Sequence, residues 1–170
     1  DGVVAGIGIR PNVELAEAAG LKLENGIVVN EKLETSLPGI YAAGDVVNFF
    51  HAALEKRVHV EHEDNAIFMG KLAGRNMAGA SETYTRTPMF YSDLFELGYE
   101  AVGEMSSKME TVSDWQEEPF KKGVVYYLEE GRVRGVLLWN VWKQVDNARA
   151  LMLEEGPFEA GDLIGRIKGD

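Results

Sequence analysis

The chain has no cysteine among its 170 residues, and basic residues are scarce relative to acidic ones. Without cysteine there is neither a disulfide framework nor a redox dithiol in this sequence. Lysine and arginine together number 17 against 28 aspartates and glutamates, which gives a formal net charge of -11. Such a charge argues against nucleic acid and against anionic membrane surfaces as partners.

Long apolar runs are also missing, as is any signal or transit peptide at the start of the sequence. We therefore expect no membrane span and a cytoplasmic location. The sequence opens directly inside an apolar segment, residues 2–7, which we expect to form a buried strand. Gly6 and Gly8 are not followed by the third glycine of a complete dinucleotide-binding turn. We therefore expect the chain to be a fragment of a longer protein.

What the chain does contain is enough apolar sequence, 45% of its residues, for a substantial core. Up to about residue 81 the pattern alternates between helix and strand signals, and beyond it β-branched and aromatic residues dominate. We expect strands over 2–7, 27–29 and 40–43, a helix from Asn12, a loop over 46–60 and a helix over 61–77. The second part predicts strands near 89–95, 98–104, 109–112, 123–128 and 132–138, with helices over 144–154 and 160–168. The turn Glu129–Gly131 predicts that the last two strands form a hairpin.

The helix over 61–77 carries several small residues at spacings of three and four. We expect it to bury one face and to pack closely through its glycines and alanines. The residues of this expected face are Ala66, Met69, Gly70, Ala73, Gly74 and Met77. Its N-terminal end offers free backbone N–H groups and the positive end of the helix dipole.

The most informative segment is Thr35–Asp45, in which a turn leads into a short apolar run that ends in Gly44 and Asp45. A carboxylate at the C-terminal end of a buried strand lies where open α/β sheets bind ligands. Gly44 allows a ligand to approach the backbone, and the Asp45 carboxylate accepts hydrogen bonds from hydroxyl groups. Gly-Asp after a strand is also a common turn, so the pair alone does not decide between the two interpretations.

The whole segment resembles the second flavin-binding motif of flavoproteins that contain two dinucleotide-binding domains. Four further stretches resemble the C-terminal half of ferredoxin-reductase-like flavoproteins, and the apoptosis-inducing factor branch is the best match among them. The four stretches are Gly8–Ala16, Val60–Ala66, Pro88–Asp93 and Gly135–Asn140.

The resemblance implies an incomplete, Rossmann-like α/β half of an FAD domain, followed by an α+β domain with an antiparallel sheet. It assigns residues 1–11 to the tail of an NAD(P)H domain, 12–81 to the second half of the FAD domain and 82–170 to the C-terminal domain.

The same resemblance implies which residues contact the cofactor or the nucleotide. Asp45, preceded by Gly44, would hold the ribityl chain of FAD. Glu61, His62 and Glu63, at the start of a helix, would lie near the isoalloxazine ring. Many relatives have a histidine where Glu63 stands, and an anion there opposes flavin reduction. Tyr91 would stack on the flavin or on the nicotinamide or adenine. Glu100 and Asn140 would contact nucleotide.

On this basis the chain is expected to be part of an FAD-dependent NAD(P)H oxidoreductase. Hydride would pass from the nicotinamide to the flavin, and electrons would leave to an unidentified acceptor, such as a small iron–sulfur protein or a quinone. We expect no catalytic side chain and no metal ligand, and we expect the fragment alone to be inactive. The alternative is a non-catalytic fragment that acts in dimerisation or interaction, with a homodimer as one form.

Overall fold

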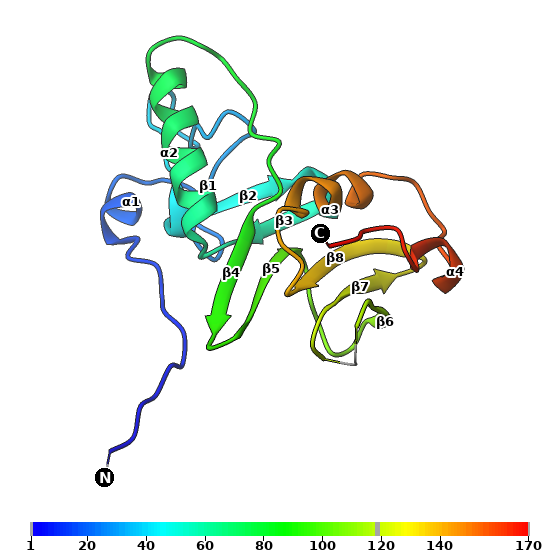
Figure 1. The fold of residues 1–170 in the computed structure, drawn as a ribbon. Helices are drawn as coiled ribbons and strands as arrows, with labels where there is room; N and C mark the ends of the chain where they lie inside the picture. Colours follow the sequence, from blue (N-terminus) through cyan, green and yellow to red (C-terminus); the bar gives the residue numbers. More distant parts are fainter. Residues whose placement is uncertain (1, 118–119, 170) are drawn as a thin grey trace. The chain divides into compact units, whose positions relative to one another are not determined.

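The structure, a computed structural model, describes residues 2–117 and 120–169 (Figure 1). The chain separates into two compact units. The N-terminal unit comprises the residues through Phe50 together with Arg57–Glu61 and Ala66–Tyr84. The C-terminal unit comprises His51–Lys56, His62–Asn65 and the chain from Thr85 onward. Within the described ranges no helix is both long enough and apolar enough to cross a membrane.

Short elements build the first half of the chain. They are α1 (Glu14–Ala18), β1 (Ile27–Val28), the 3-10 helices η1 (Gly44–Val46) and η2 (Ala52–Leu54), β2 (Val47–His51), β3 (Lys56–His59) and α2 (Glu63–Met77). The three strands form one sheet in the order β1-β2-β3. In this sheet β1 runs parallel to β2, with Ile27 opposite Val47.

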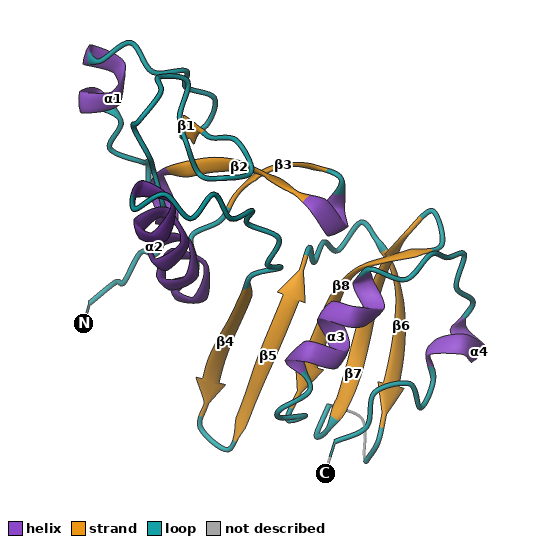
Figure 2. Ribbon diagram, turned by 90° about the horizontal axis from the view of Figure 1, so that it is seen from above, coloured by secondary structure: helices purple, strands orange, loops and turns teal. Residues whose placement is uncertain are grey.

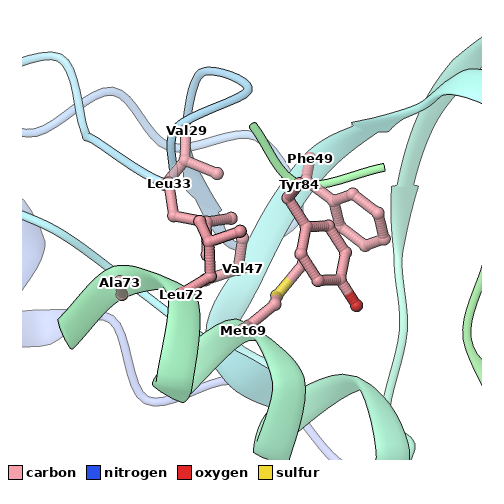
Figure 3. Packing of buried hydrophobic residues seen from close by; sticks show 8 residues of the cluster. All are labelled: Val29, Leu33, Val47, Phe49, Met69, Leu72, Ala73 and Tyr84. Atoms are coloured by element: carbon pink, nitrogen blue, oxygen red, sulfur yellow. The ribbon is translucent and has the colours of Figure 1, made fainter. Parts of the chain in front are cut away.

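The core of the N-terminal unit lies between α2 and β2, as Figure 3 shows. Helix α2 contributes Met69 and Leu72, and β2 contributes Val47 and Phe49. The ring of Tyr84 meets the ring of Phe49 edge-on, with 5.6 Å between centroids. The chain that follows α2 is thereby returned to the same core, which closes the unit.

Helix α2 begins two residues later than predicted, and of the expected face only Met69 and Ala73 are buried. Its buried residues are Asn65, Met69, Leu72, Ala73 and Asn76. Gly70 and Gly74, expected in a close contact, face open space, and Met77 is 68% exposed. The true face includes two asparagines, and hydrophobicity alone therefore places its centre wrongly. The Asn76 amide is satisfied by hydrogen bonds to the backbone of Lys32 and Glu82.

The predicted loop over 46–60 is wrong, because this segment forms β2, η2 and β3. Four of the five residues of β2 are buried, so the strand lacks the alternation that marks a half-exposed strand. Glu55 is exposed and has a positive φ of 55° directly after η2, where the chain turns into β3.

Two predicted strands do not form. Residues 40–43 make only an isolated bridge between Tyr41 and Glu34. Residues 2–7 form no strand, and Val3, Val4 and Ile7 are more than nine-tenths exposed. A strand needs a hydrogen-bonding neighbour, and no described strand pairs with this segment.

The C-terminal unit is built on a five-stranded antiparallel sheet in the order β4-β5-β8-β7-β6. Helix α3 lies across β5 and β8 (Figure 2), and the short helix α4 contacts β6. The elements are β4 (Met89–Leu94), β5 (Leu97–Gly103), β6 (Glu110–Trp115), β7 (Gly123–Glu129), β8 (Arg132–Trp139), α3 (Val145–Met152) and α4 (Ala160–Leu163).

Sequence reasoning locates this sheet well. All five strands occur close to their predicted positions, and the predicted hairpin joins β7 to β8, with Glu129 opposite Arg132. Helix α3 also matches its prediction. The helix predicted over 160–168 is shorter than expected and ends at Leu163. Gly165, with a positive φ of 76°, follows closely and is incompatible with continued helix.

We predict that Met69→Ala destabilises the protein by about 2–5 kcal/mol, because it empties a fully buried position between α2 and β2. Met77→Ala is the matched control, since it makes the same change on an exposed part of the same helix. Equilibrium urea unfolding measures both. Equal losses for the two variants would contradict the placement of the α2 face.

A second prediction concerns His51, whose Nδ1 accepts a hydrogen bond from the backbone N–H of Leu54. Burial, aided by the charges of Arg134 and Lys56, lowers the pKa of His51 from 6.5 to about 4. Between these values the unfolded chain binds a proton that the folded chain does not. Stability should therefore fall as the pH drops from about 6.5 to 4, by about 3 kcal/mol in all.

His51→Asn should abolish this contribution while keeping a side-chain acceptor for Leu54 N. Urea midpoints measured at intervals across the window test it. The lowered pKa of Asp64 acts below its ordinary value of 3.8, outside this window. An unchanged pH dependence in the variant would contradict the assignment to His51.

Candidate functional site

A tight turn at Gly44 presents Asp45. Ala43 is extended, and Gly44 then adopts a φ of +81°, a conformation that strains any other residue. A Cβ built on Gly44 would lie 3.4 Å from the Cβ of Ala66, in the first turn of α2. The Gly44 turn therefore lies against this part of α2, within the N-terminal unit.

The Asp45 carboxylate is exposed, and among residues 2–117 and 120–169 no group hydrogen-bonds to it or pairs with it. Its backbone is held instead: His59 Nε2 donates a hydrogen bond to the Asp45 carbonyl oxygen. The His59 side chain is 9% exposed, and its Nδ1 lies 3.7 Å from Glu61 Oε1. The turn is thus fixed from β3, while the carboxylate itself is left available.

His59 is a residue that sequence reasoning missed as part of this site. The sequence predicts a long loop around His59, and a single histidine in a loop does not indicate a binding role. Once 56–59 is recognised as a strand beside β2, the histidine lies next to the Asp45 turn. Glu61, predicted to line a cofactor, is the acidic neighbour of His59.

His62 and Glu63 precede and begin α2, respectively. The His62 imidazole lies against the ring of Phe90, with 4.6 Å between centroids and a tilt of 38°. Glu63 is exposed, and its negative charge at the helix start is favoured by the dipole of α2. His62 therefore connects the beginning of α2 to β4 within the C-terminal unit.

Tyr91 and Glu100 lie directly opposite each other on β4 and β5 and so share a face of the sheet. Tyr91 is 58% exposed, which leaves ring surface free for stacking. Glu100 Oε2 accepts a hydrogen bond of 3.2 Å from the backbone N–H of Lys143. Glu100 therefore also holds the segment that leaves β8.

Asn140 has a structural role in that same segment. It adopts a positive φ of 52°, and its Oδ1 accepts a hydrogen bond of 2.8 Å from Gly98 N. Its Nδ2 donates to the carbonyl of Lys121 at 2.9 Å, and its own N–H donates to the carbonyl of Gly98. Most of the amide is thus engaged in the fold, and contact with a nucleotide stays a prediction.

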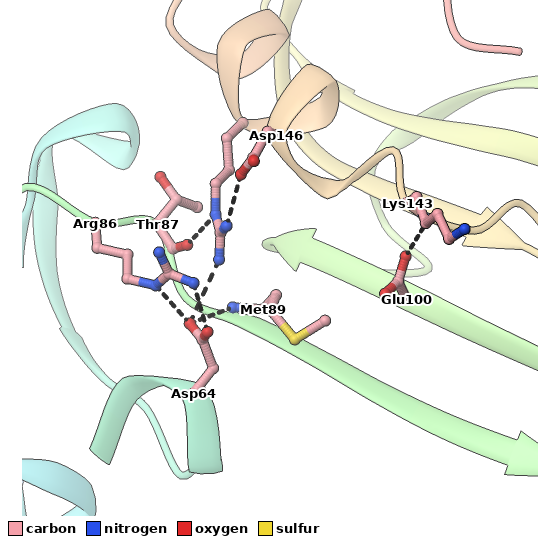
Figure 4. A network of polar contacts seen from close by, with 8 residues as sticks. Asp64, Arg86, Thr87, Met89, Glu100, Lys143 and Asp146 are labelled. Carbon is pink, nitrogen blue, oxygen red and sulfur yellow. Dashed lines mark hydrogen bonds and ion pairs between the residues drawn. The ribbon is translucent and has the colours of Figure 1, made fainter. Parts of the chain in front are cut away.

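A partly buried ionic network is centred on Asp64, two residues after His62 (Figure 4). The carboxylate of Asp64, in the first turn of α2, accepts two hydrogen bonds from Arg86, of 2.6 and 2.9 Å. Asp64 Oδ2 also accepts from Met89 N at 3.3 Å and lies 3.4 Å from Arg149 Nη2. Arg149, on α3, donates further to the Thr87 carbonyl and to Asp146.

In this network the favourable interactions of the Asp64 carboxylate outweigh the cost of its burial. Burial on its own would raise the pKa of Asp64, but hydrogen bonds from Arg86 and Met89 and the nearby charge of Arg149 outweigh burial and lower it. The side chain of Asp64 is only 12% exposed, and that of Arg149 16%. Asp64 is therefore a charged carboxylate inside the fold. No group of three or more metal-ligating side chains occurs in the part of the chain that the structure describes.

Comparison with solved structures gives the fold class of this arrangement. A putidaredoxin reductase in covalent complex with putidaredoxin aligns with a TM-score of 0.80 and 31% identity, covering 93% of this chain and 38% of that one. A ferredoxin reductase from Rhodopseudomonas palustris aligns at 0.78 with 28% identity, covering 93% and 40%. The chain therefore has the fold of part of the ferredoxin reductases, which confirms the predicted α/β half followed by an α+β domain.

Sequence comparison identifies the family. Residues 1–70 match the model of the pyridine nucleotide-disulphide oxidoreductases. Residues 73–118 and 113–154 match that of the C-terminal region of the mitochondrion-associated apoptosis-inducing factor. The chain belongs to the pyridine nucleotide-disulphide oxidoreductase family, and it carries the C-terminal part of the type found in the apoptosis-inducing factor branch.

Individual relatives agree with this assignment. Apoptosis-inducing factor 1, mitochondrial, from Dictyostelium discoideum is 36% identical over 94% of this chain and 32% of its own length. Putidaredoxin reductase CamA from Pseudomonas putida is 33% identical over 97% of this chain and 39% of its own length. The chain thus spans about a third of the length of the curated relatives that it matches.

The role found for Asn140 generates a prediction. Asn140→Gly keeps the positive φ but removes the amide bridge between Gly98 and Lys121, so it should cost about 1–2 kcal/mol of stability. Glu130→Gly is the control, because Glu130 is exposed and has a similar φ of 51°. Thermal or urea unfolding measures both, and a stabilised Asn140→Gly protein would contradict the bridging role.

Proposed function

We propose that the chain is the C-terminal part of an FAD-dependent NAD(P)H oxidoreductase that passes electrons to a separate acceptor. Membership of the family and the reductase fold support this proposal. The observation that carries it is Asp45, an exposed carboxylate without a protein partner among the described residues, on a turn that is fixed from behind. We also propose the division into residues 1–11, 12–81 and 82–170.

The Asp45 turn fits the hydroxylated chain of a flavin. A carboxylate that makes no ion pair is free to accept hydrogen bonds from neighbouring hydroxyls, and charged acceptors form the stronger bonds. Gly44 gives the backbone its tight path, and His59 prevents the turn from relaxing. FAD, when bound, supplies the hydride and electron chemistry, and the protein supplies binding and orientation.

The C-terminal unit is proposed to contribute contacts to the flavin ring and to the nucleotide. The exposed ring of Tyr91 suits stacking on a planar heterocycle. His62 and Glu63, at the positive end of the α2 dipole, would influence charge at the ring, and Glu61 would act through His59. Glu100 and Asn140 would contact nucleotide with the polar atoms that their bonds to Lys143, Gly98 and Lys121 leave available.

The electron acceptor is proposed to be a small iron–sulfur protein. One structural relative is described as a putidaredoxin reductase in complex with putidaredoxin, and relatives of similar identity include a ferredoxin–NAD(+) reductase component from Burkholderia cepacia. A quinone remains the alternative acceptor. The chain lacks cysteine, so electrons would leave without a dithiol in these residues.

We predict that Asp45→Asn in the full-length protein weakens FAD binding by about tenfold to a hundredfold, because a neutral amide replaces a charged acceptor. Glu31→Gln, which neutralises an exposed carboxylate elsewhere in the N-terminal unit, is the matched control. Flavin absorbance after dialysis measures retention, and bleaching by NADH tests the reaction.

The outcomes separate the candidate functions. A yellow wild-type protein that is bleached by NADH, together with a colourless Asp45→Asn variant, supports the proposal. A full-length protein that binds no flavin would refute it and favour a non-catalytic interaction role. A yellow wild type with an equally yellow Asp45→Asn variant would remove Asp45 from the site.

A further inference from the structure

We propose that Asp64 is a positioning residue, which sets the place of His62 and Tyr91 by tying the first turn of α2 to the start of β4 and to α3. The inference rests on the proposed function, because His62 and Tyr91 matter only if they face a flavin. It concerns contacts within the C-terminal unit alone.

Segments from three parts of the chain meet at the carboxylate of Asp64. Asp64 belongs to α2, Arg86 and Met89 lie at the entry to β4, and Arg149 belongs to α3. The partners are 22, 25 and 85 residues away in the sequence. In Figure 4 the Arg86 side chain and the backbone nitrogen of Met89 approach the Asp64 carboxylate. A single side chain therefore fixes the relative register of three elements.

An aromatic contact lies immediately beside the hydrogen bond between Asp64 and Met89. His62 is two residues before Asp64, and Phe90 directly follows Met89. The rings of these two neighbours are in contact, with 4.6 Å between centroids. The bond from Met89 N to Asp64 thus braces the His62–Phe90 contact from one side, and Tyr91 is the next residue along β4. A shift of the Asp64 anchor would move both residues proposed to face the ring.

A gain in stability alone does not explain the ionic network of Asp64. Buried ion pairs pay a desolvation penalty that often cancels their attraction, and apolar residues of similar volume stabilise a fold as well or better. A partly buried, bidentate carboxylate–arginine pair provides fixed geometry. Asp64 and Arg86 meet in this way, and Arg149 adds a tie to the Thr87 carbonyl at 2.8 Å.

The test uses Asp64→Asn in the full-length flavoprotein, with Asp146→Asn as the matched control. Asp146 pairs with the same Arg149, but its side chain is 95% exposed. Asp64→Asn should lower kcat for NADH oxidation about tenfold to a hundredfold through misplacement, with KM changed far less. It should also alter the visible circular dichroism of the flavin and shift its reduction potential in the positive direction, since a negative charge is lost. Asp146→Asn should match the wild type in all three measurements.

A folded Asp64→Asn protein whose kcat, circular dichroism and potential equal those of the wild type would overturn the inference, even if its stability were reduced. If Asp64→Asn does not fold, Arg149→Lys decides by the same measurements. Lysine keeps the charge but cannot hold Asp64 and the Thr87 carbonyl with one planar group. A wild-type protein without flavin would refute the proposed function instead, so the two failures are distinguishable.

Discussion

The contact on which the C-terminal unit depends is the carboxylate of Asp64 between two arginines. It joins the beginning of α2, the entry to β4 and the helix α3, which are far apart in the sequence. All three segments meet at this one carboxylate through hydrogen bonds or an ion pair of 2.6 to 3.4 Å. The directional hydrogen bonds of this ionic contact fix the relative positions of the three segments more closely than apolar packing alone would.

A comparison with another pair in the same chain shows why burial matters. Arg75 and Glu82 also meet through several short hydrogen bonds, but both side chains are about half exposed. Solvent screens such a pair, and it adds little to stability. The side chain of Asp64 is only 12% exposed, so solvent screens its ion pairs with Arg86 and Arg149 much less. The same chemistry is therefore incidental on the surface and structural at Asp64.

The parts of the fold that sequence reasoning predicted are those where side-chain pattern and burial agree. Strands β7 and β8 alternate or run apolar between clear turn residues, and their hairpin was placed correctly. The misses at α2 and β2 have a common cause, because burial there does not follow hydrophobicity. Helix α2 buries Asn65 and Asn76 while Gly70 faces open space, and β2 buries Asn48. Tertiary hydrogen bonds, invisible in one sequence, make those positions favourable.

The candidate site also contains residues that the sequence pattern predicts and residues that only the folded structure shows. Gly44 and Asp45 could be predicted as site residues because they end the segment Thr35–Asp45, which resembles a known flavin-binding motif, and the positive φ of Gly44 is compatible with a glycine there. His59, Arg86 and Arg149 could not, since each is an ordinary polar residue whose role arises from a partner distant in the chain. A sequence motif therefore predicts a candidate ligand-binding group, whereas the residues that hold its turn in place are found only in the folded structure. That difference explains why Asp64, only two residues from the predicted His62, escaped notice: its function lies in what it anchors.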